Sequence, residues 1–118
     1  MPGVYAEADI LVFPTLCDEW GLVANEAMAA GLPVLGSLFS QAVEELVEDG
    51  RHGWTYRPDR DAECRDAIDR ALSTSNDELA AMGRTCRERI ADFSFDRVAD
   101  RMVAAIAHAL PPGAPPRR

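Results

Sequence analysis

The chain has 118 residues, a formal net charge of −8, 47% apolar residues and 27% charged residues. This length suits one domain or part of one, and the composition is typical of a soluble globular protein. Residues 1–59 hold ten acidic residues against two arginines, whereas residues 60–118 are balanced. A nucleic-acid-binding protein needs a basic stripe, so we expect no nucleic acid as a partner.

The longest uncharged stretch, residues 27–43, is interrupted by glycine, proline, serine and glutamine. A bilayer span needs about 20 mostly apolar residues, so no transmembrane segment is expected. The N-terminal stretch "MPGVYAEAD" contains two acids and no basic opening, unlike a signal peptide. We therefore expect a cytoplasmic protein.

The three cysteines, Cys17, Cys64 and Cys86, are far apart and are not spaced as zinc ligands. We expect them to be free, buried thiols, and we expect neither a metal nor a cofactor. His52 and His108 have no obvious catalytic partner.

The first half of the chain alternates between strand and helix patterns. The apolar run "DILVFPT" (9–15) predicts a strand buried on both faces, with its core at residues 10–13. A helix follows and ends at Gly31, a favourable C-cap. "PVLGS" (33–37) predicts a second strand, a short helix begins at Ser40, and residues 54–57 predict a third strand.

The second half predicts helices only. Two helices cover approximately residues 59–72 and 75–93, and Ser75 and Glu78 are spaced as a capping box at the start of the second. A last helix covers 96–110, and residues 111–118 form a disordered, proline-rich tail. We expect the first helix to bury one apolar stripe: Cys64, Ala67, Ile68, Ala71 and Leu72. The stripe on the last helix is Val98, Met102, Val103, Ile106, Ala109 and Leu110.

Strands that alternate with helices indicate an α/β fold, here a Rossmann-like parallel sheet with flanking helices. Three strands are few for such a sheet. Residues 1–110 therefore predict half of a doubly wound domain.

Glu26 lies in a helix that has almost no polar face. On a helical wheel it falls between Leu22 and Val23, which predicts a buried carboxylate. Such a group costs several kcal/mol unless it is paired or hydrogen-bonded. Its partner is either a structural one, an arginine or backbone donors, or a ligand hydroxyl at the sheet edge, and composition alone leaves both open.

The helix start favours the ligand. In open α/β sheets, ligands bind beyond the carboxyl ends of the strands, and this helix starts at that edge. The free N–H groups of Gly21, Leu22 and Val23 predict an anion site, and Gly21 allows a phosphate to approach the backbone.

The segment "ADILVFPTLCDEWGLVANEAMAAGLPVLGS" resembles the donor-site motif of glycosyltransferase family 4, the group 1 glycosyltransferases. The continuations "EELVEDGRHGWTYRPDRD" and "FSFDRVADRMVAAI" are similar to the turn, strand and closing helix of the same family. The resemblance covers roughly residues 5–110. It implies the C-terminal, donor-binding domain of the two-domain B-type (GT-B) fold, in truncated form, and a retaining transferase that uses a nucleoside-diphosphate sugar and a hydroxyl acceptor.

The resemblance also implies roles for two acids. Glu26 matches the residue that binds the ribose hydroxyls. Asp18 matches the residue that holds the hydroxyls of the donor sugar, where the family usually has glutamate, so it is the catalytic candidate. Glu19, one position away, is the alternative, and Glu45 is a further donor-binding candidate.

Several parts that the resemblance implies are absent from this sequence: the arginine and lysine that hold the diphosphate, the nucleobase pocket, and the N-terminal acceptor domain. We therefore expect the chain alone to be inactive. The alternative is a non-catalytic, dimeric remnant that kept the fold. In either case, the strand at 10–13 would be a central strand of the usual sheet whose neighbouring strand is missing, and its uncovered edge predicts a homodimer. Asp59-Arg60-Asp61 resembles a metal-binding motif, but we expect its acids to cap the next helix and to complement its dipole.

Overall fold

The computed structural model describes residues 2–109 and contains one parallel sheet of three strands. The strands are β1 (Leu11–Phe13), β2 (Val34–Ser37) and β3 (Gly53–Tyr56), in the order β1-β2-β3. Leu11 pairs with Val34, and Val34 pairs with Gly53. The predicted α/β class with a parallel sheet is confirmed.

The described residues form six helices: α1 (Pro2–Ala6), α2 (Leu22–Ala30), α3 (Gln41–Leu46), α4 (Asp61–Ser73), α5 (Asn76–Ala91) and α6 (Phe95–Ala109). All but α1 were predicted. Helix α1 has only five residues and no acidic first turn or basic last turn to mark it in the sequence. The predicted tail at 111–118 and Leu110 lie outside the described residues.

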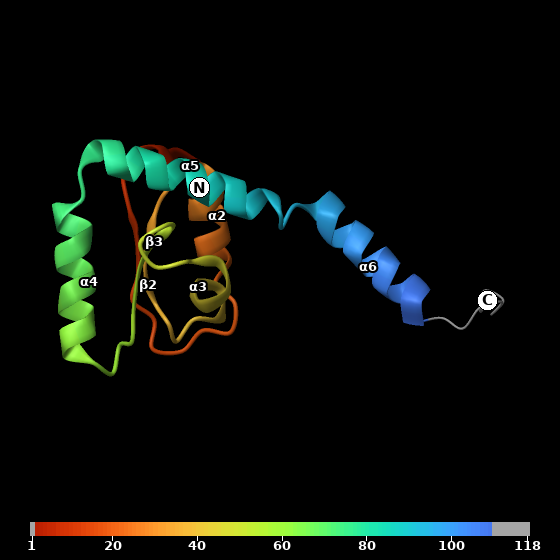
Figure 1. Ribbon diagram of the computed structural model, residues 1–118, viewed down its shortest axis with the longest axis horizontal. Coiled ribbons are helices and arrows are strands. Elements are labelled where there is room, and N and C mark those ends of the chain that lie inside the picture. Colours follow the sequence, from red (N-terminus) through yellow and green to blue (C-terminus); the bar gives the residue numbers. More distant parts are fainter. Residues whose placement is uncertain (1, 110–118) are drawn as a thin grey trace.

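The helices cover both faces of the sheet (Figure 1). Helices α2 and α3 pack on one face, and α4 packs on the other, while α5 crosses the end where the strands begin. Strand β2 supplies side chains to both layers, because Val34 points to one core and Leu35 to the other. One core comprises Ala24, Met28, Val34, Ala42, Val43, Leu46, Val47 and Cys86, and the other comprises Leu35, Trp54, Tyr56, Ala67 and Ala71.

Two local signals in the sequence are confirmed at helix ends. Gly31 adopts a left-handed conformation (φ 88°), and its N–H donates to the carbonyls of Ala27 and Met28 at the end of α2. Ser75 and Glu78 form both hydrogen bonds of a capping box at the start of α5.

Helices α2 and α5 approach each other closely through two glycines. A Cβ atom placed on Gly83 would lie 2.3 Å from the carbonyl oxygen of Gly31. This approach brings the fully buried side chains of Met28 and Cys86 into one core. The position of α2, which carries Glu26, therefore depends on a glycine 57 positions away in the sequence.

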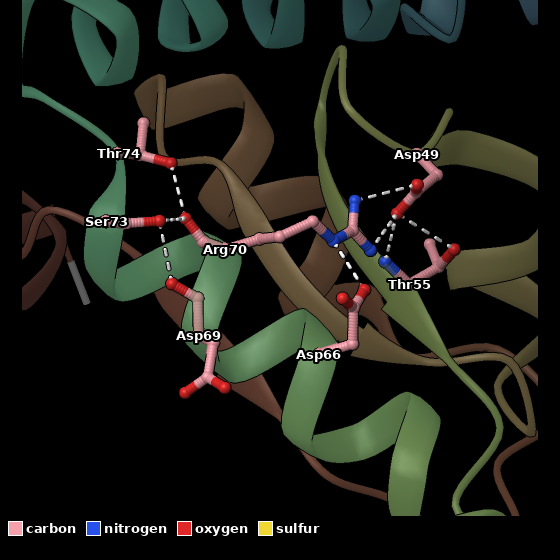
Figure 2. A network of polar contacts seen from close by, with 7 residues as sticks. All are labelled: Asp49, Thr55, Asp66, Asp69, Arg70, Ser73 and Thr74. Atoms are coloured by element: carbon pink, nitrogen blue, oxygen red, sulfur yellow. Dashed lines mark hydrogen bonds and ion pairs between the residues drawn. The ribbon is translucent and has the colours of Figure 1, made fainter.

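A polar network ties α4 to the turn before β3 (Figure 2). The guanidinium of Arg70 donates to both carboxylate oxygens of Asp49, at 3.0 and 3.2 Å, and its Nε donates to Asp66 at 2.9 Å. Asp49 also accepts the backbone N–H of Thr55 at 2.8 Å. One carboxylate thus joins the turn, the strand and the helix.

Some predictions about α4 and its surroundings were wrong. Ile68 and Leu72 are 45% and 79% exposed, because α4 packs on the sheet through its small residues, Ala67 and Ala71. Arg60 rather than an aspartate is the N-cap of α4, and no side chain caps it. Asp61 lies in the first turn, where it complements the helix dipole as expected, and Asp59 pairs with Arg57.

The expectation of three buried thiols was also wrong. Cys86 is buried, Cys64 is half-buried and Cys17 is exposed. Cys17 lies in the loop after β1 and lines an open hollow beside α3.

Helix α6 projects away from the rest of the molecule (Figure 1). The molecule measures 59 × 30 × 23 Å, and its radius of gyration is 17.7 Å, against about 13 Å for a compact domain of 100 residues. The apolar stripe of α6 is exposed at Val98, Met102, Val103 and Ile106. Among residues 2–109, no helix has the length and apolar character that crossing a membrane requires.

Candidate functional site

The carboxyl ends of all three parallel strands meet at the edge of the sheet opposite α5 (Figure 1). The loops that follow β1, β2 and β3 start at this edge, and α2 begins there. Ligands of open α/β sheets bind at this edge, so the candidate site is built from these loops.

Asp18 is fixed between the loops after β1 and β2. Its backbone N–H donates to the carbonyl of Phe39 at 3.1 Å, and its carbonyl accepts the N–H of Gln41 at 3.2 Å. The hydroxyl of the fully buried Ser40 donates to Asp18 Oδ2 at 3.3 Å. The half-buried carboxylate of Asp18 is therefore held by contacts with residues more than 20 positions away.

A hollow of about 430 Å³ opens beside Asp18, lined by Cys17, Asp18, Glu19, Leu38, Phe39, Gln41 and Glu44. We call it the Asp18 hollow. The guanidinium of Arg57 lies over the ring of Phe39, 5.3 Å from its centroid. Asp59 accepts two hydrogen bonds from this guanidinium, and they hold the pKa of Asp59 below its ordinary value.

The first turn of α2 carries no side-chain cap. Its N-cap, Gly21, has an extended backbone (φ −78°, ψ 95°) that any residue adopts. A Cβ atom at Gly21 would nevertheless lie 2.6 Å from both Asp18 Oδ2 and Phe13 Cζ. Position 21 therefore requires glycine, because Asp18 and Phe13 approach its backbone too closely for a Cβ atom. The close approach at Gly21 places the start of α2 beside Asp18, and in this first turn Leu22 is exposed and Val23 is half-buried.

The predicted burial of Glu26 is wrong, because its side chain is exposed. Helix α2 turns Ala24, Ala27 and Met28 into the core, and Glu26 lies on the uncovered side. Its partner is a phenol: the hydroxyl of Tyr5 in α1 donates to Glu26 Oε2 at 2.9 Å. The carboxylate thus stands at the surface and is not locked to an arginine.

Glu45 lies apart from the Asp18 hollow, and its neighbour Glu44 lines that hollow instead. Glu45 lines a larger hollow of about 620 Å³ between α3 and α5. The arginines there are already engaged, Arg51 with Glu48 at 3.2 Å and Arg89 with the carbonyl of Glu45 at 2.9 Å. Burial lowers the pKa of His52 in the same hollow, which favours a neutral imidazole.

The structure brings Asp18, Glu19, Gly21, Leu22 and Val23 together at the sheet edge. Glu26 lies one turn further along α2. Sequence reasoning missed Tyr5, whose hydroxyl donates to Glu26, and Ser40, whose hydroxyl donates to Asp18, because each contact joins residues more than 20 positions apart. Within residues 2–109, no three acidic, histidine or cysteine side chains are grouped to hold a metal ion.

Comparison with known proteins adds the family. Residues 1–74 match the family described as "Glycosyl transferases group 1". The chain is 32% identical to the D-inositol 3-phosphate glycosyltransferase of Gordonia bronchialis over 110 residues, which are 93% of this chain and 24% of that protein. It is 34% identical to the protein of the same name from Nocardia farcinica over 107 residues, or 91% and 23% of the two chains.

Solved structures show the same fold. The sucrose-phosphate synthase of Thermosynechococcus elongatus superposes with a TM-score of 0.74 at 29% identity, covering 89% of this chain and 26% of that one. TarM superposes with a TM-score of 0.73 at 20% identity, which supports the fold alone. The chain spans about a quarter of the length of these relatives. Because residues 1–74, more than half of the chain, match this family, the chain belongs to the group 1 glycosyltransferases.

Proposed function

We propose that this chain is the donor-binding part of a retaining glycosyltransferase, which transfers a glycosyl group from a nucleoside-diphosphate sugar to a hydroxyl acceptor. One observation carries the proposal: the carboxylate of Asp18 and the uncapped first turn of α2 meet at the carboxyl edge of the sheet. The name of two relatives, D-inositol 3-phosphate glycosyltransferase, describes transfer of a glycosyl group, which supports the same reaction class for this chain.

The proposed donor follows the first turns of α2. Its diphosphate lies at the N–H groups of Gly21, Leu22 and Val23, where the helix carries a partial positive charge. The ribose hydroxyls donate to Glu26 and the sugar hydroxyls donate to Asp18. Glu19, which also lines the Asp18 hollow, is the alternative for the sugar, and Glu45 is assigned only a peripheral contact.

In the proposed reaction, the bond between the anomeric carbon and the diphosphate oxygen breaks, and its electron pair stays on the diphosphate. The acceptor hydroxyl forms the new bond to the anomeric carbon on the same face of the sugar, and its proton passes to the leaving phosphate. Negative charge grows on the diphosphate as the bond breaks. The amides at the start of α2 are oriented to stabilise that charge.

The acceptor site, the nucleobase pocket and the basic residues that hold the diphosphate are assigned to a further domain. The described sheet edge contributes acids and one helix start, and the relatives are about four times as long as this chain. We therefore propose that the 118-residue chain alone binds its donor weakly and transfers no sugar. The acceptor and a cytoplasmic location stay predictions.

The test is an NMR titration of the labelled chain with ADP, GDP and UDP and with the sugar derivatives of each. The amide signals of Gly21, Leu22 and Val23 should shift. Asp18→Asn should remove the advantage of the sugar derivative over the bare diphosphate, whereas Asp69→Asn, at an exposed position on α4, is the matched control. Shifts confined to the hollow between α3 and α5 would contradict the proposal, and submicromolar binding would contradict the expected weakness of the isolated chain.

We also propose a homodimer through β1. This strand lies at the edge of the sheet, and its Val12 side chain is 58% exposed. An uncovered edge strand pairs readily with another chain. Light scattering at working concentration should give the mass of two chains, and a monomer would contradict this proposal.

A further inference from the structure

We propose that Tyr5 is a positioning residue for Glu26: its phenol fixes one carboxylate oxygen and leaves the other for the ribose hydroxyls. The ribose contact itself rests on the proposed function above. The geometry is a single contact between two helices, in which the hydroxyl of Tyr5 in α1 donates to Glu26 Oε2 at 2.9 Å. The two residues are 21 positions apart, and α1 packs against α2.

The chemistry of a carboxylate suits this division. An ionised carboxylate only accepts hydrogen bonds, and its two oxygens offer about four lone-pair sites. The phenol of Tyr5 occupies one site on Oε2, and within the described part of the chain no donor contacts Oε1. That oxygen is free to accept hydrogen bonds from a vicinal diol such as the 2′- and 3′-hydroxyls of ribose.

The exposure of Glu26 makes positioning necessary. An exposed glutamate has three rotatable side-chain bonds, and a ligand that orders it loses affinity to the lost rotamer freedom. The half-buried ring of Tyr5 holds the carboxylate in one place before the ligand arrives. A phenol is already protonated across the physiological range, and the same hydrogen bond raises the pKa of Tyr5 further.

A second hydroxyl plays the corresponding part at the other acid of the site. Ser40 donates to Asp18 Oδ2 at 3.3 Å from the loop after β2. Both acids that the family motif singles out are therefore held through one oxygen by a hydroxyl from another element. This repetition argues that the Tyr5 contact serves the site and does more than join α1 to α2.

The test is a double-mutant cycle on the full chain with Tyr5→Phe, Glu26→Gln and the combination. Dissociation constants are measured by NMR titration with whichever of ADP, GDP and UDP binds best, and with its 2′,3′-dideoxy form. Tyr5→Phe should weaken binding of the ribose form roughly three- to tenfold, as expected for one hydrogen bond. It should have no effect in the Glu26→Gln background or with the dideoxy form. Tyr56→Phe is the matched control, because it removes the same hydroxyl from the other tyrosine of the chain, which packs in the core with Leu35 and Trp54.

The outcomes separate the two proposals. If Glu26→Gln leaves binding unchanged, the ribose contact is wrong and the positioning role falls with it. Two outcomes would overturn only the positioning role. In the first, Glu26→Gln weakens binding but Tyr5→Phe does not. In the second, Tyr5→Phe weakens binding equally in the wild-type and the Glu26→Gln backgrounds. A measurement without ligand decides the same point: side-chain scalar couplings of Glu26 should report one rotamer in the wild type and averaging in Tyr5→Phe. Unchanged couplings would overturn the inference even if no nucleotide binds.

Discussion

Replacing Gly83 by alanine sets two effects of known size against each other. Alanine is favoured over glycine in a helix interior by about 1 kcal/mol, so the substitution should stabilise α5 taken alone. In the folded chain, the new Cβ would lie 2.3 Å from the carbonyl oxygen of Gly31. A relaxed carbon–oxygen contact is about 3.3 Å or longer, so α5 must move roughly 1 Å away from α2.

The movement costs more than the helix gains. A gap of about 0.5–1 Å forfeits a quarter to a half of the dispersion energy of each contact, and here it would open the core around Met28 and Cys86. Overpacking of this kind typically costs about 1–3 kcal/mol. We therefore expect Gly83→Ala to lower the free energy of unfolding by roughly 1–2 kcal/mol and the Tm by about 4–8 °C.

The assay is thermal and urea unfolding followed by circular dichroism. The matched control is Gly3→Ala in α1, where a Cβ atom would meet nothing within 4 Å. That variant should leave the Tm unchanged or raise it slightly. If Gly83→Ala raises the Tm as much as Gly3→Ala, the close approach of α2 and α5 is not what holds the two helices together.

Two further predictions concern titratable groups. Burial raises the pKa of the Asp49 carboxyl, but the hydrogen bonds from Arg70 and from Thr55 outweigh burial and hold it below its ordinary value. The stabilisation is therefore complete above the unfolded-state pKa of about 3.9 and is lost as the pH falls through the lower folded-state pKa. Because both side chains are more than a third exposed, Asp49→Asn should cost at most about 1 kcal/mol at neutral pH in urea unfolding, with the difference vanishing in acid. Asp69→Asn, at an exposed position, should show no such loss. If Asp49→Asn lowers the free energy of unfolding equally at all pH values, the ionised Asp49 carboxylate is not the source of the stabilisation. Burial raises the pKa of the Cys86 thiol to about 12, whereas Cys17 is exposed. Ellman's reagent should therefore label Cys17 in the native state and Cys86 only on unfolding. Rapid labelling of Cys86 in the native state would refute its burial.

The sequence by itself determined the features that depend on near neighbours. The left-handed Gly31 and the capping box of Ser75 and Glu78 were predictable, because helix ends are set by hydrogen bonds that reach only three or four residues. The order of strands and helices was predictable for the same reason, since hydrophobic periodicity is local. The family motif around Asp18 and Glu26 is equally a property of one continuous stretch.

The tertiary structure decided which faces are covered. Glu26 was expected in the core, but only one side of α2 packs against other elements, so the carboxylate stands at the surface beside Tyr5. Ile68 on α4 is exposed for a similar reason, because the helix approaches the sheet through its alanines. Burial and partner choice depend on which distant segments meet. A hydroxyl 21 residues away, or a glycine that lets two helices touch, leaves no periodic trace in the sequence.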